Sequence, residues 1–387
     1  MAPPLRRTLR RWLLPGLGLG TLALVAFAFA STGCGAAFGA RATGPRLARM
    51  EASPNFGEGT FLNVALSEPR PHQPWKALGR IFDDNLRSPA KPLPRARPSA
   101  SELAAPPASG LRVTWMGHSS VLLSLDGAQI LFDPVWSERV SPVAWAGPKR
   151  FQAPPIPLTD LPQLQAVVIS HDHYDHLDQP TIEALQTRTE RFVVPLGIGA
   201  HLERWGVPSS KIVELDWWQE SDLGAVTLVC TPAHHFSGRS LTDRNSTLWA
   251  SWVVRGPEHR VYFGGDSGMF PGYAEIGERE GPFDLTLLPI GAYDEAWAEM
   301  HLNPEEALQA HRQLRGEVML PIHWASFPLA LHDWHEPGDR LLIAAAETGS
   351  LILTPVQGRP VELREGAPPL FPAWWRARGP LRVAGLD

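Results

Sequence analysis

Cysteine and clustered positive charge are both scarce in this chain of 387 residues. It has only two cysteines, Cys34 and Cys230, so no intramolecular disulfide is possible if Cys34 carries a modification. Lysine and arginine number 35 against 40 aspartates and glutamates, and they form no basic stripe of the kind that neutralises phosphates. We therefore do not expect nucleic acid to be a partner.

The amino terminus combines positive charge with a long apolar run. Arginines at positions 6, 7, 10 and 11 precede the apolar residues 12–30, which is the pattern of an export signal. The next four residues, Ser-Thr-Gly-Cys at 31–34, resemble the lipobox of bacterial lipoproteins, with serine where leucine is usual. Three interpretations of this segment stay open: lipid attachment at Cys34, an uncleaved membrane anchor, and ordinary secretory cleavage. We favour an exported lipoprotein at a membrane surface of the bacterial cell envelope.

Composition divides the rest of the chain into three parts. Residues 35–110 carry glycine, proline and arginine with only short apolar patches, which predicts a partly irregular extracytoplasmic lead-in. Strand-like runs begin at Leu111, and residues 111–360 alternate such runs with helical patterns, which indicates one α/β domain. Residues 361–387 are assigned to a C-terminal tail.

Several local signals inside this domain are structural. Asp126-Gly127 lies between two strand-like runs and favours a tight hairpin. Asn303 can cap a helix that begins at Pro304, and Glu306 can reach back to it. The carboxylates at this helix start, and Asp178 at another, are therefore interpreted as helix-entry residues and not as catalytic acids.

Residues 170–176, Ser-His-Asp-His-Tyr-Asp-His, have a high density of metal ligands. They directly follow the apolar run 167–169. Imidazole and carboxylate groups suit borderline divalent ions such as zinc. Because alternate residues of an extended segment project the same way, His171 and His173 can share one ion, while Asp175 and His176 could reach a second.

More ligand-type side chains follow other apolar runs. Residues 226–229 lead to His234 and His235, residues 261–265 lead to Asp266, and residues 318–322 lead to His323. Buried strands fix backbone positions while the loops after them bear function, so four strand ends could converge on one site. For each of these residues alone, a structural role is favoured over metal binding. Together with residues 170–176, they predict a metal centre.

These motifs together resemble the metallo-β-lactamase superfamily. The pattern His-x-His-x-Asp-His, followed by a distal His, a distal Asp and a final His, is the ligand order of that superfamily. The likeness extends, over about residues 111–330, to the branch of N-acyl-phosphatidylethanolamine-hydrolysing phospholipase D and its bacterial relatives. The segments that carry it include VTWMGH at 113–118, GPKRF at 147–151, HYDHLD at 173–178, TPAHH at 231–235, LWASW at 248–252 and IHW at 322–324.

The resemblance implies a four-layer αβ/βα sandwich with two zinc ions at the edge of its sheets; other divalent transition metals could replace zinc. One ion would be held by His171, His173 and His235, the other by Asp175, His176 and His323, and Asp266 would bridge them. His234 competes with His235, which is preferred because the Thr-Pro-x-x-His register of the family falls there. Family members often show an amide where His234 stands, so an exchange of roles stays open.

Further residues are placed around these ligands. His301 matches a histidine near the scissile phosphate in the phospholipase D relatives; it could transfer a proton to the leaving group, or it could be a surface histidine beside a helix cap. Asp133 and His118 are interpreted as residues that orient ligating imidazoles or shape turns. Tryptophans could supply an apolar face for a lipid, namely Trp145, Trp217, Trp218, Trp297 and Trp324.

The resemblance and the export signal together predict a zinc-dependent phosphodiesterase of the phospholipase D type, acting on N-acyl-phosphatidylethanolamine-like or related phospholipids. A hydroxide shared by two ions about 3.5 to 4 Å apart would attack phosphorus, with Asp175, Asp266 and His301 as catalytic residues. A lactonase or other small-substrate phosphoesterase of the same fold is one alternative, and a surface-tethered binding protein without activity is another. A broad apolar groove would favour the lipid, and a narrow basic pocket the small anion.

Overall fold

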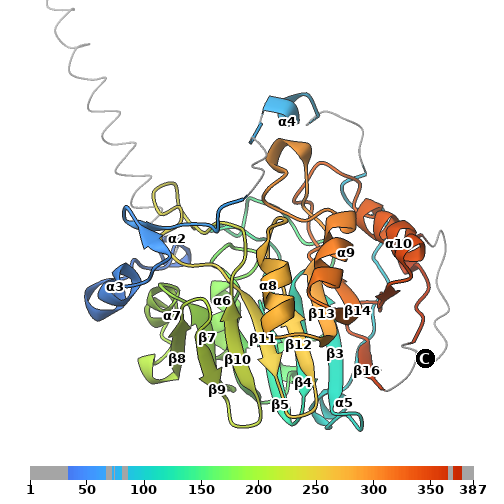
Figure 1. Ribbon diagram of the computed structural model, residues 1–387, viewed down its shortest axis with the longest axis horizontal. Helices are drawn as coiled ribbons and strands as arrows, with labels where there is room; N and C mark the ends of the chain where they lie inside the picture. The colour runs from blue at the N-terminus through green and yellow to red at the C-terminus, as the bar shows by residue number, and fades with distance from the viewer. Residues whose placement is uncertain (1–33, 67–71, 74, 81–85, 365–368, 377–387) are drawn as a thin grey trace, which may run out of the picture.

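The computed structural model describes residues 34–66, 72–73, 75–80, 86–364 and 369–376 (Figure 1). Within these ranges, no helix is both long enough and apolar enough to cross a bilayer. The predicted export segment, including all of the lipobox-like motif except Cys34, lies outside the described residues.

Two mixed sheets of seven strands each form the centre of the molecule (Figure 1). In spatial order, the first sheet consists of β16 (Pro360–Leu363), β3 (Leu111–Gly117), β4 (Ser120–Leu125), β5 (Ala128–Phe132), β6 (Leu164–Val168), β7 (Thr189–Pro195) and β8 (Ile212–Leu215). The second sheet consists of β15 (Leu351–Ile352), β14 (Gly316–Ile322), β13 (Phe283–Pro289), β12 (Arg260–Phe263), β11 (Ser251–Arg255), β10 (Thr227–Thr231) and β9 (Glu220–Asp222).

Strands of the first sheet are buried on both faces. Successive side chains of a strand project to opposite sides, so Val113 and Leu123 enter the core shared with the second sheet. Leu122 and Leu131 project the other way, into a separate core beneath the helices. Burial on both faces explains why the sequences of these strands are nearly continuous apolar runs.

Helices cover the outer face of each sheet. Side chains of α5 (Ala100–Ala104), α6 (Gln179–Leu185) and α7 (Gly199–Arg204) pack in the outer core of the first sheet. Those of α8 (Gly272–Arg279), α9 (Pro304–Gln313) and α10 (Glu336–Thr348) pack against the second, and Figure 1 shows α8 and α9 lying over its strands. The order helix, sheet, sheet, helix confirms the predicted four-layer α/β sandwich.

Two local predictions are confirmed by backbone geometry. β4 and β5 pair with Leu125 opposite Ala128, and the turn residues between them, Asp126 and Gly127, have positive φ angles of 48° and 92°. Such a turn matches the twist of the flanking strands. The start of α9 has a capping box in which Asn303 and Glu306 exchange hydrogen bonds of 2.9 Å and 3.1 Å.

The region expected to be a partly irregular lead-in contains short elements that pack on the sandwich. They are α2 (Cys34–Ala37), α3 (Gly44–Glu51), β1 (Phe56–Gly57), β2 (Thr60–Phe61) and α4 (Trp75–Arg80). Met50 and Phe61 are buried in the main core, and Leu103 of α5 is buried in the outer one. Elsewhere in the described residues, short turns of 3₁₀ helix lie at Leu158–Asp160, Ser209–Lys211, Glu295–Trp297 and Trp374–Arg376.

The expected domain boundary at residue 360 falls at the first residue of β16. This strand pairs antiparallel with β3, with Val361 opposite Val113, and forms one edge of the first sheet. Beyond it, Trp374 and Trp375 are buried beside Trp324. A four-residue edge strand carries too little periodicity to be separated from a tail by sequence, so the folded region extends past the expected boundary.

Candidate metal centre

The residues predicted to bind metal come from loops at one edge of the two sheets. β5, β6 and β7 are parallel, as are β12, β13 and β14, so within each set the carboxyl ends meet. Residues 170–176 follow β6, Asp266 follows β12 and His323 follows β14. His235 follows β10, which is antiparallel to β11 and therefore runs in the same direction as β12.

Three imidazoles form the first cluster, which we call the three-histidine group: His171, His173 and His235. Nδ1 of His173 lies 2.8 Å from Nε2 of His171 and 3.4 Å from Nε2 of His235. The three ligand nitrogens lie within 4.8 Å of one another. Imidazole nitrogens that converge in this way can share one cation.

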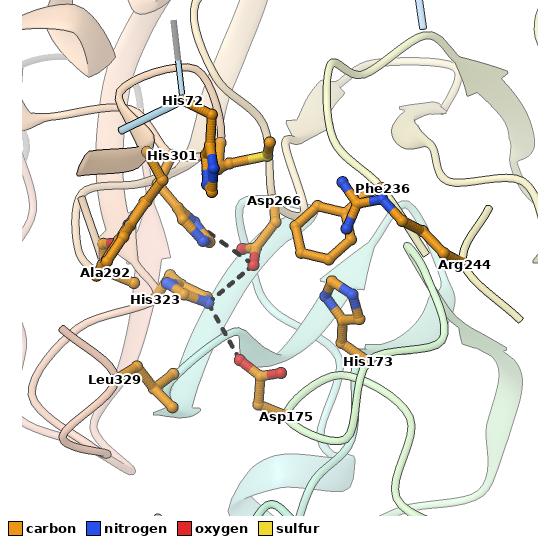
Figure 2. Close-up of a pocket in the computed structure, with 12 residues that line it drawn as sticks. His72, His173, Asp175, Phe236, Arg244, Asp266, Ala292, His301, His323 and Leu329 are labelled. Atoms are coloured by element: carbon orange, nitrogen blue, oxygen red, sulfur yellow. Dashed lines mark hydrogen bonds and ion pairs between the residues drawn. The ribbon is translucent and has the colours of Figure 1, made fainter. Parts of the chain in front are cut away.

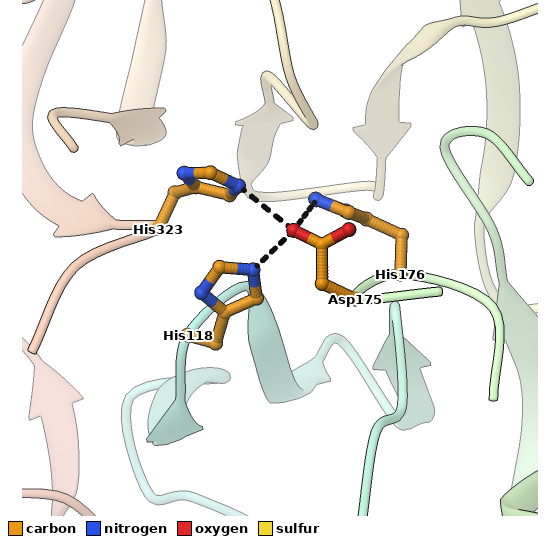
Figure 3. Close-up of side chains that lie close together, drawn as sticks. All are labelled: His118, Asp175, His176 and His323. Carbon is orange, nitrogen blue, oxygen red and sulfur yellow. Dashed lines mark hydrogen bonds and ion pairs between the residues drawn. The ribbon is translucent and has the colours of Figure 1, made fainter. Parts of the chain in front are cut away.

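The second cluster combines imidazoles with a carboxylate, and we call it the mixed group: His118, Asp175, His176 and His323 (Figure 3). Oδ2 of Asp175 lies 3.0 Å from Nε2 of His118 and 3.3 Å from Nε2 of His323. It also lies 3.5 Å from Nε2 of His176. From the sequence, His118 was expected to orient a ligating imidazole or to shape a turn. Its φ of 53° does place it in a turn, but its ring also contacts Asp175 directly.

Asp266 lies between the two groups. Its Oδ2 is 3.1 Å from Nε2 of His176 and 3.0 Å from Nε2 of His323, both in the mixed group. The same oxygen is 4.0 Å from Nε2 of His171 and 3.9 Å from Nε2 of His235. One carboxylate oxygen is therefore within reach of ligands from both groups, as expected for a bridging residue.

Hydrogen bonds on the far side of three imidazoles aim their Nε2 atoms inward. Nδ1 of His171 lies 2.9 Å from the Ser170 hydroxyl, and Nδ1 of His235 lies 3.0 Å from the Met300 carbonyl. Nδ1 of His176 lies 2.7 Å from Oδ2 of Asp133, which also accepts from the Ser170 hydroxyl. Outer partners of this kind fix the tautomer and orientation of metal-binding histidines. Asp133 therefore lies where the sequence predicted a residue that orients a ligating imidazole.

Charges differ between the two groups. Burial, with help from neighbouring imidazoles, holds the pKa of His171 well below its ordinary value. Burial also lowers the pKa of His323, but the carboxylates of Asp266 and Asp175 outweigh it and raise that pKa to about 9. Burial opposes ionisation of Asp266 as well, yet the His176 and His323 imidazoles hold its pKa well below its ordinary range.

Several buried ligand atoms satisfy a direct test of whether a metal fits. Within the described part of the chain, Nε2 of His176, Nε2 of His323 and Oδ1 of Asp266 are buried and form no hydrogen bond. A buried polar atom without a partner is costly, and a coordinated cation would satisfy all three. The donor set of imidazole nitrogens and carboxylate oxygens also suits zinc and similar ions. The residues therefore fit a metal centre.

The structure places His235, and not His234, in the cluster. Nδ1 of His234 is buried without a hydrogen-bond partner among the described residues, and its ring lies 6.4 Å from that of Phe270. Its backbone N–H donates to the Ser267 hydroxyl. This arrangement corresponds to the Thr-Pro-x-x-His register chosen from the sequence.

His301 lies in the wall of a pocket of about 610 Å³ that opens over the centre (Figure 2). Its Nδ1 is 3.7 Å from Oδ2 of Asp266, and its ring stacks on His323 with centroids 5.2 Å apart. Burial lowers the pKa of His301 to about 4, while the Asp266 carboxylate acts in the opposite direction. The side chain therefore faces the site, in a position from which it can contact a bound molecule.

The remaining wall of the pocket is mostly apolar and was not predicted, apart from Trp297. Phe236 packs against His173 and His235, with ring centroids 4.5 Å and 4.7 Å away, and the Arg244 guanidinium lies 4.3 Å from the Phe236 ring. The other lining residues outside the clusters are His72, Ala292, Trp297, Met300 and Leu329. They come from several segments that lie far apart in the sequence.

Of the other tryptophans considered for an apolar face, Trp217 and Trp324 are buried in the core. Trp218 is partly buried beneath the Arg279 guanidinium. Trp145 is 80% exposed. Only Trp297 among the five lines the pocket.

A family model described as the beta-lactamase superfamily domain matches residues 128–324, which include every predicted metal ligand. The chain belongs to the metallo-β-lactamase superfamily. It is accordingly a metal-dependent hydrolase of that superfamily, built on the α/β sandwich described above.

Relatives of this superfamily member span most of its length. An uncharacterized protein of Mycobacterium tuberculosis is 46% identical over 385 residues, which cover 96% of this chain and 99% of that protein. N-acyl-phosphatidylethanolamine-hydrolyzing phospholipase D 1 of Caenorhabditis elegans is 40% identical over 246 residues, 60% of this chain and 69% of that protein. A metallo hydrolase from the archaeon Ignicoccus hospitalis has a solved structure with a TM-score of 0.51 and 23% identity, covering 65% of this chain and 97% of that one. This last similarity concerns the fold alone.

Proposed function

We propose that this metallo-β-lactamase superfamily member is a dinuclear zinc phosphodiesterase of the phospholipase D type, acting on N-acyl-phosphatidylethanolamine-like phospholipids. The observation that carries the proposal is the position of Asp266 Oδ2, which lies within 4.0 Å of imidazoles from both groups. The similarity to the Caenorhabditis elegans phospholipase supports the substrate class.

Each group would hold one ion. The three-histidine group would bind the first, and Asp175, His176 and His323 of the mixed group would bind the second, with Asp266 shared. When bound, the two ions would activate water for attack on phosphorus and offset the negative charge of the transition state. His118, whose Nε2 lies 3.0 Å from Asp175 Oδ2, would hold that carboxylate in place.

His301 would act on the leaving group. Hydrolysis forms a bond from water oxygen to phosphorus and breaks the bond to the alcohol oxygen, which must gain a proton. With its pKa lowered to about 4 by burial, His301 is neutral at pH 7 and keeps one ring N–H. From the pocket wall beside Asp266, this N–H would donate a hydrogen bond to the departing oxygen, which water then protonates.

The pocket suits an amphiphilic anion. Its apolar side chains, including Phe236, Trp297 and Leu329, can contact an acyl chain. Arg244 is the one arginine or lysine among the lining residues, and within the described chain it forms no ion pair. A guanidinium stacked on an aromatic ring keeps its N–H edge available for an oxyanion. A mostly apolar pocket with a single cation favours a lipid phosphodiester over a small, highly charged substrate.

The test uses the full chain, purified in detergent and loaded with zinc. Turnover is compared on N-acyl-phosphatidylethanolamine, on a soluble phosphodiester and on a lactone. We expect release of N-acylethanolamine and phosphatidate, with weaker turnover of the soluble diester. Lactone hydrolysis without phosphodiester hydrolysis would overturn the proposal in favour of a lactonase. Two bound zincs with no turnover of any of the three would favour a binding protein.

We also propose that the protein is exported and attached to a membrane by lipid at Cys34, where it would meet phospholipids. The proposal rests on the charged and apolar residues 1–30 and on the lipobox-like motif. In a bacterial host, Cys34→Ala should move the protein from the membrane to the soluble fraction and block incorporation of labelled palmitate. Unchanged fractionation would contradict lipid attachment and support an uncleaved anchor.

A further inference from the structure

The segment that follows β2 contacts the main chain of a metal-site histidine. Nδ2 of Asn63 donates a hydrogen bond of 2.6 Å to the carbonyl oxygen of His235. Oδ1 of Asn63 accepts from the backbone N–H of His235 at 3.1 Å and from the indole N–H of Trp249 at 3.0 Å. One amide therefore holds both polar groups of the His235 main chain, although the two residues are 172 positions apart.

Three hydrogen bonds determine the orientation of this amide. The backbone N–H and the indole N–H can only donate, so the atom that faces them must be the Asn63 oxygen. If the amide were turned over, its NH₂ group would face two donors and its oxygen would face the His235 carbonyl. The donor and acceptor positions on Asn63 are thus both matched to His235.

Asn63 is itself held in place by the hairpin of β1 and β2. Phe61 is fully buried, its ring meets that of Phe56 edge to face, and its N–H donates to the carbonyl of Asn245 at 2.8 Å. The N–H of Leu62 donates to the carbonyl of Asn55 at 2.9 Å. Asn63 therefore projects from an anchored backbone, two residues beyond a buried aromatic side chain.

His235 needs such support because it lies in a loop. β10 ends at Thr231, four residues earlier, so the sheet does not fix the backbone at His235. The Met300 carbonyl fixes its ring through Nδ1, and Asn63 fixes its main chain. Together the two contacts direct Nε2 toward His171 and His173.

We propose that Asn63 is a positioning residue for the metal centre, which sets the affinity of the three-histidine group for its ion by fixing the His235 backbone. The amino-terminal region before the family domain is therefore part of the site. The inference deepens the proposed function and rests on its assignment of an ion to this group. It does not depend on which substrate is hydrolysed.

The test measures zinc affinity of the full chain by competition with a chelator, for the wild type and for Asn63→Ala. Loss of an outer contact typically weakens metal binding about 10- to 100-fold. We expect that loss for one of the two ions and no change for the other. His235→Ala should weaken the same ion, and adding Asn63→Ala to it should have no further effect, because both changes act through one ligand.

Asn55→Ala is the matched control. Asn55 lies beside the same hairpin, and its side chain donates to Asp216, away from the metal cluster. Asn55→Ala should retain both ions with wild-type affinity. If it weakened zinc binding as much as Asn63→Ala does, the effect would belong to the hairpin as a whole and the proposal would fail.

A second variant covers the case in which Asn63→Ala does not fold. Asn63→Asp keeps the size and the acceptor oxygen, but it places a carboxylate oxygen against the His235 carbonyl, so the same ion should bind about 10- to 100-fold more weakly. Wild-type zinc affinity in either folded variant overturns the proposal. Failure of the proposed activity would appear separately, as a wild-type protein that binds two zincs and hydrolyses no phosphodiester.

Discussion

The three-histidine group and the mixed group lie side by side but differ in charge. The first contains only imidazoles, and burial keeps the pKa of His171 and of His235 well below the ordinary value, so both are neutral at pH 7. In the second, carboxylates raise the pKa of His323 to about 9 and that of His176 well above its ordinary value. An ion can enter the first group without displacing protons, whereas in the second it must replace them.

This difference in charge suggests that the two groups on either side of Asp266 bind their ions in different ways. The three-histidine group offers neutral imidazoles, whereas in the mixed group a second cation would take the place of the protons that His176 and His323 hold. Asp266 contacts both groups, so its removal should affect the two groups together, while a change in either group should affect one ion first.

The largest effect is expected from Asp266→Ala. Loss of the shared carboxylate should reduce bound zinc from two ions to at most one and lower turnover by at least about 10⁴-fold, because two-ion stabilisation of a transition state contributes several kcal/mol. Metal analysis and turnover on the same samples provide the measurement. Asp284→Ala, at the opposite end of the second sheet, is the control and should retain both ions. Full activity with two zincs in Asp266→Ala would refute the bridging role.

A substitution confined to one group should remove the ion of that group and leave the other ion bound. His173→Ala should lose the ion of the three-histidine group, and His323→Ala that of the mixed group, each with turnover reduced by about 10³-fold. Zinc-edge anomalous diffraction would show which ion remains in each variant. If both variants lost the same ion, the assignment of ligands to two groups would be incorrect.

His301→Ala should lower turnover without changing metal content. His301 lies beside the shared carboxylate but belongs to neither group's ligand set as we assign it. Loss of the hydrogen bond that His301 would donate to the departing oxygen should cost about 10²-fold in kcat, and both zincs should remain. The control is His335→Ala, a change at a partly exposed residue at the start of α10, which should behave as the wild type. A loss of zinc in His301→Ala would indicate that this histidine is a ligand.

A smaller effect is expected from Asp133→Asn, which changes the partner of His176 Nδ1. Zinc affinity of the mixed group should fall by about 10- to 100-fold. That of the three-histidine group should fall less, because Asp133 reaches His171 only through the Ser170 hydroxyl. Chelator competition measures both constants. Equal weakening of the two ions would argue against separate groups.

The two groups should also lose their ions at different pH values on acidification. Because the pKa of His323 is raised to about 9, protons occupy it below that pH and compete with the ion of the mixed group. The pKa of His171 lies well below its ordinary value, so its group loses no affinity until the pH is much lower. Zinc per chain, measured after dialysis at decreasing pH from pH 9 downward, should fall in two steps, with the ion of the mixed group lost first. Loss of both ions in a single step would contradict this order.

Sequence alone predicted the parts of the site that depend on local pattern. Residues 170–176 follow a buried strand directly, and the later ligands each follow another apolar run, so strand ends could be recognised without knowing the topology. The Asp126-Gly127 hairpin and the cap at Asn303 are equally local, because turn and helix-start chemistry involves residues within a few positions.

The rest of the site depends on contacts between distant segments. Asn63 lies in a stretch with no motif, and its contact with His235 exists only because the β1–β2 hairpin packs on the sandwich. Arg244 and Leu329 meet in one pocket although 85 positions separate them. His118 was placed in a turn correctly, but its contact with Asp175 requires that the ends of β3 and β6 lie close together. Local pattern contains no information about such pairs.

Zinc-edge anomalous diffraction from crystals of the wild-type protein would locate the bound ions. We expect two peaks in each molecule, one against His171, His173 and His235 and the other against Asp175, His176 and His323. Asp266 should contact both. A single peak, or two peaks of which Asp266 contacts only one, would contradict the two-ion centre.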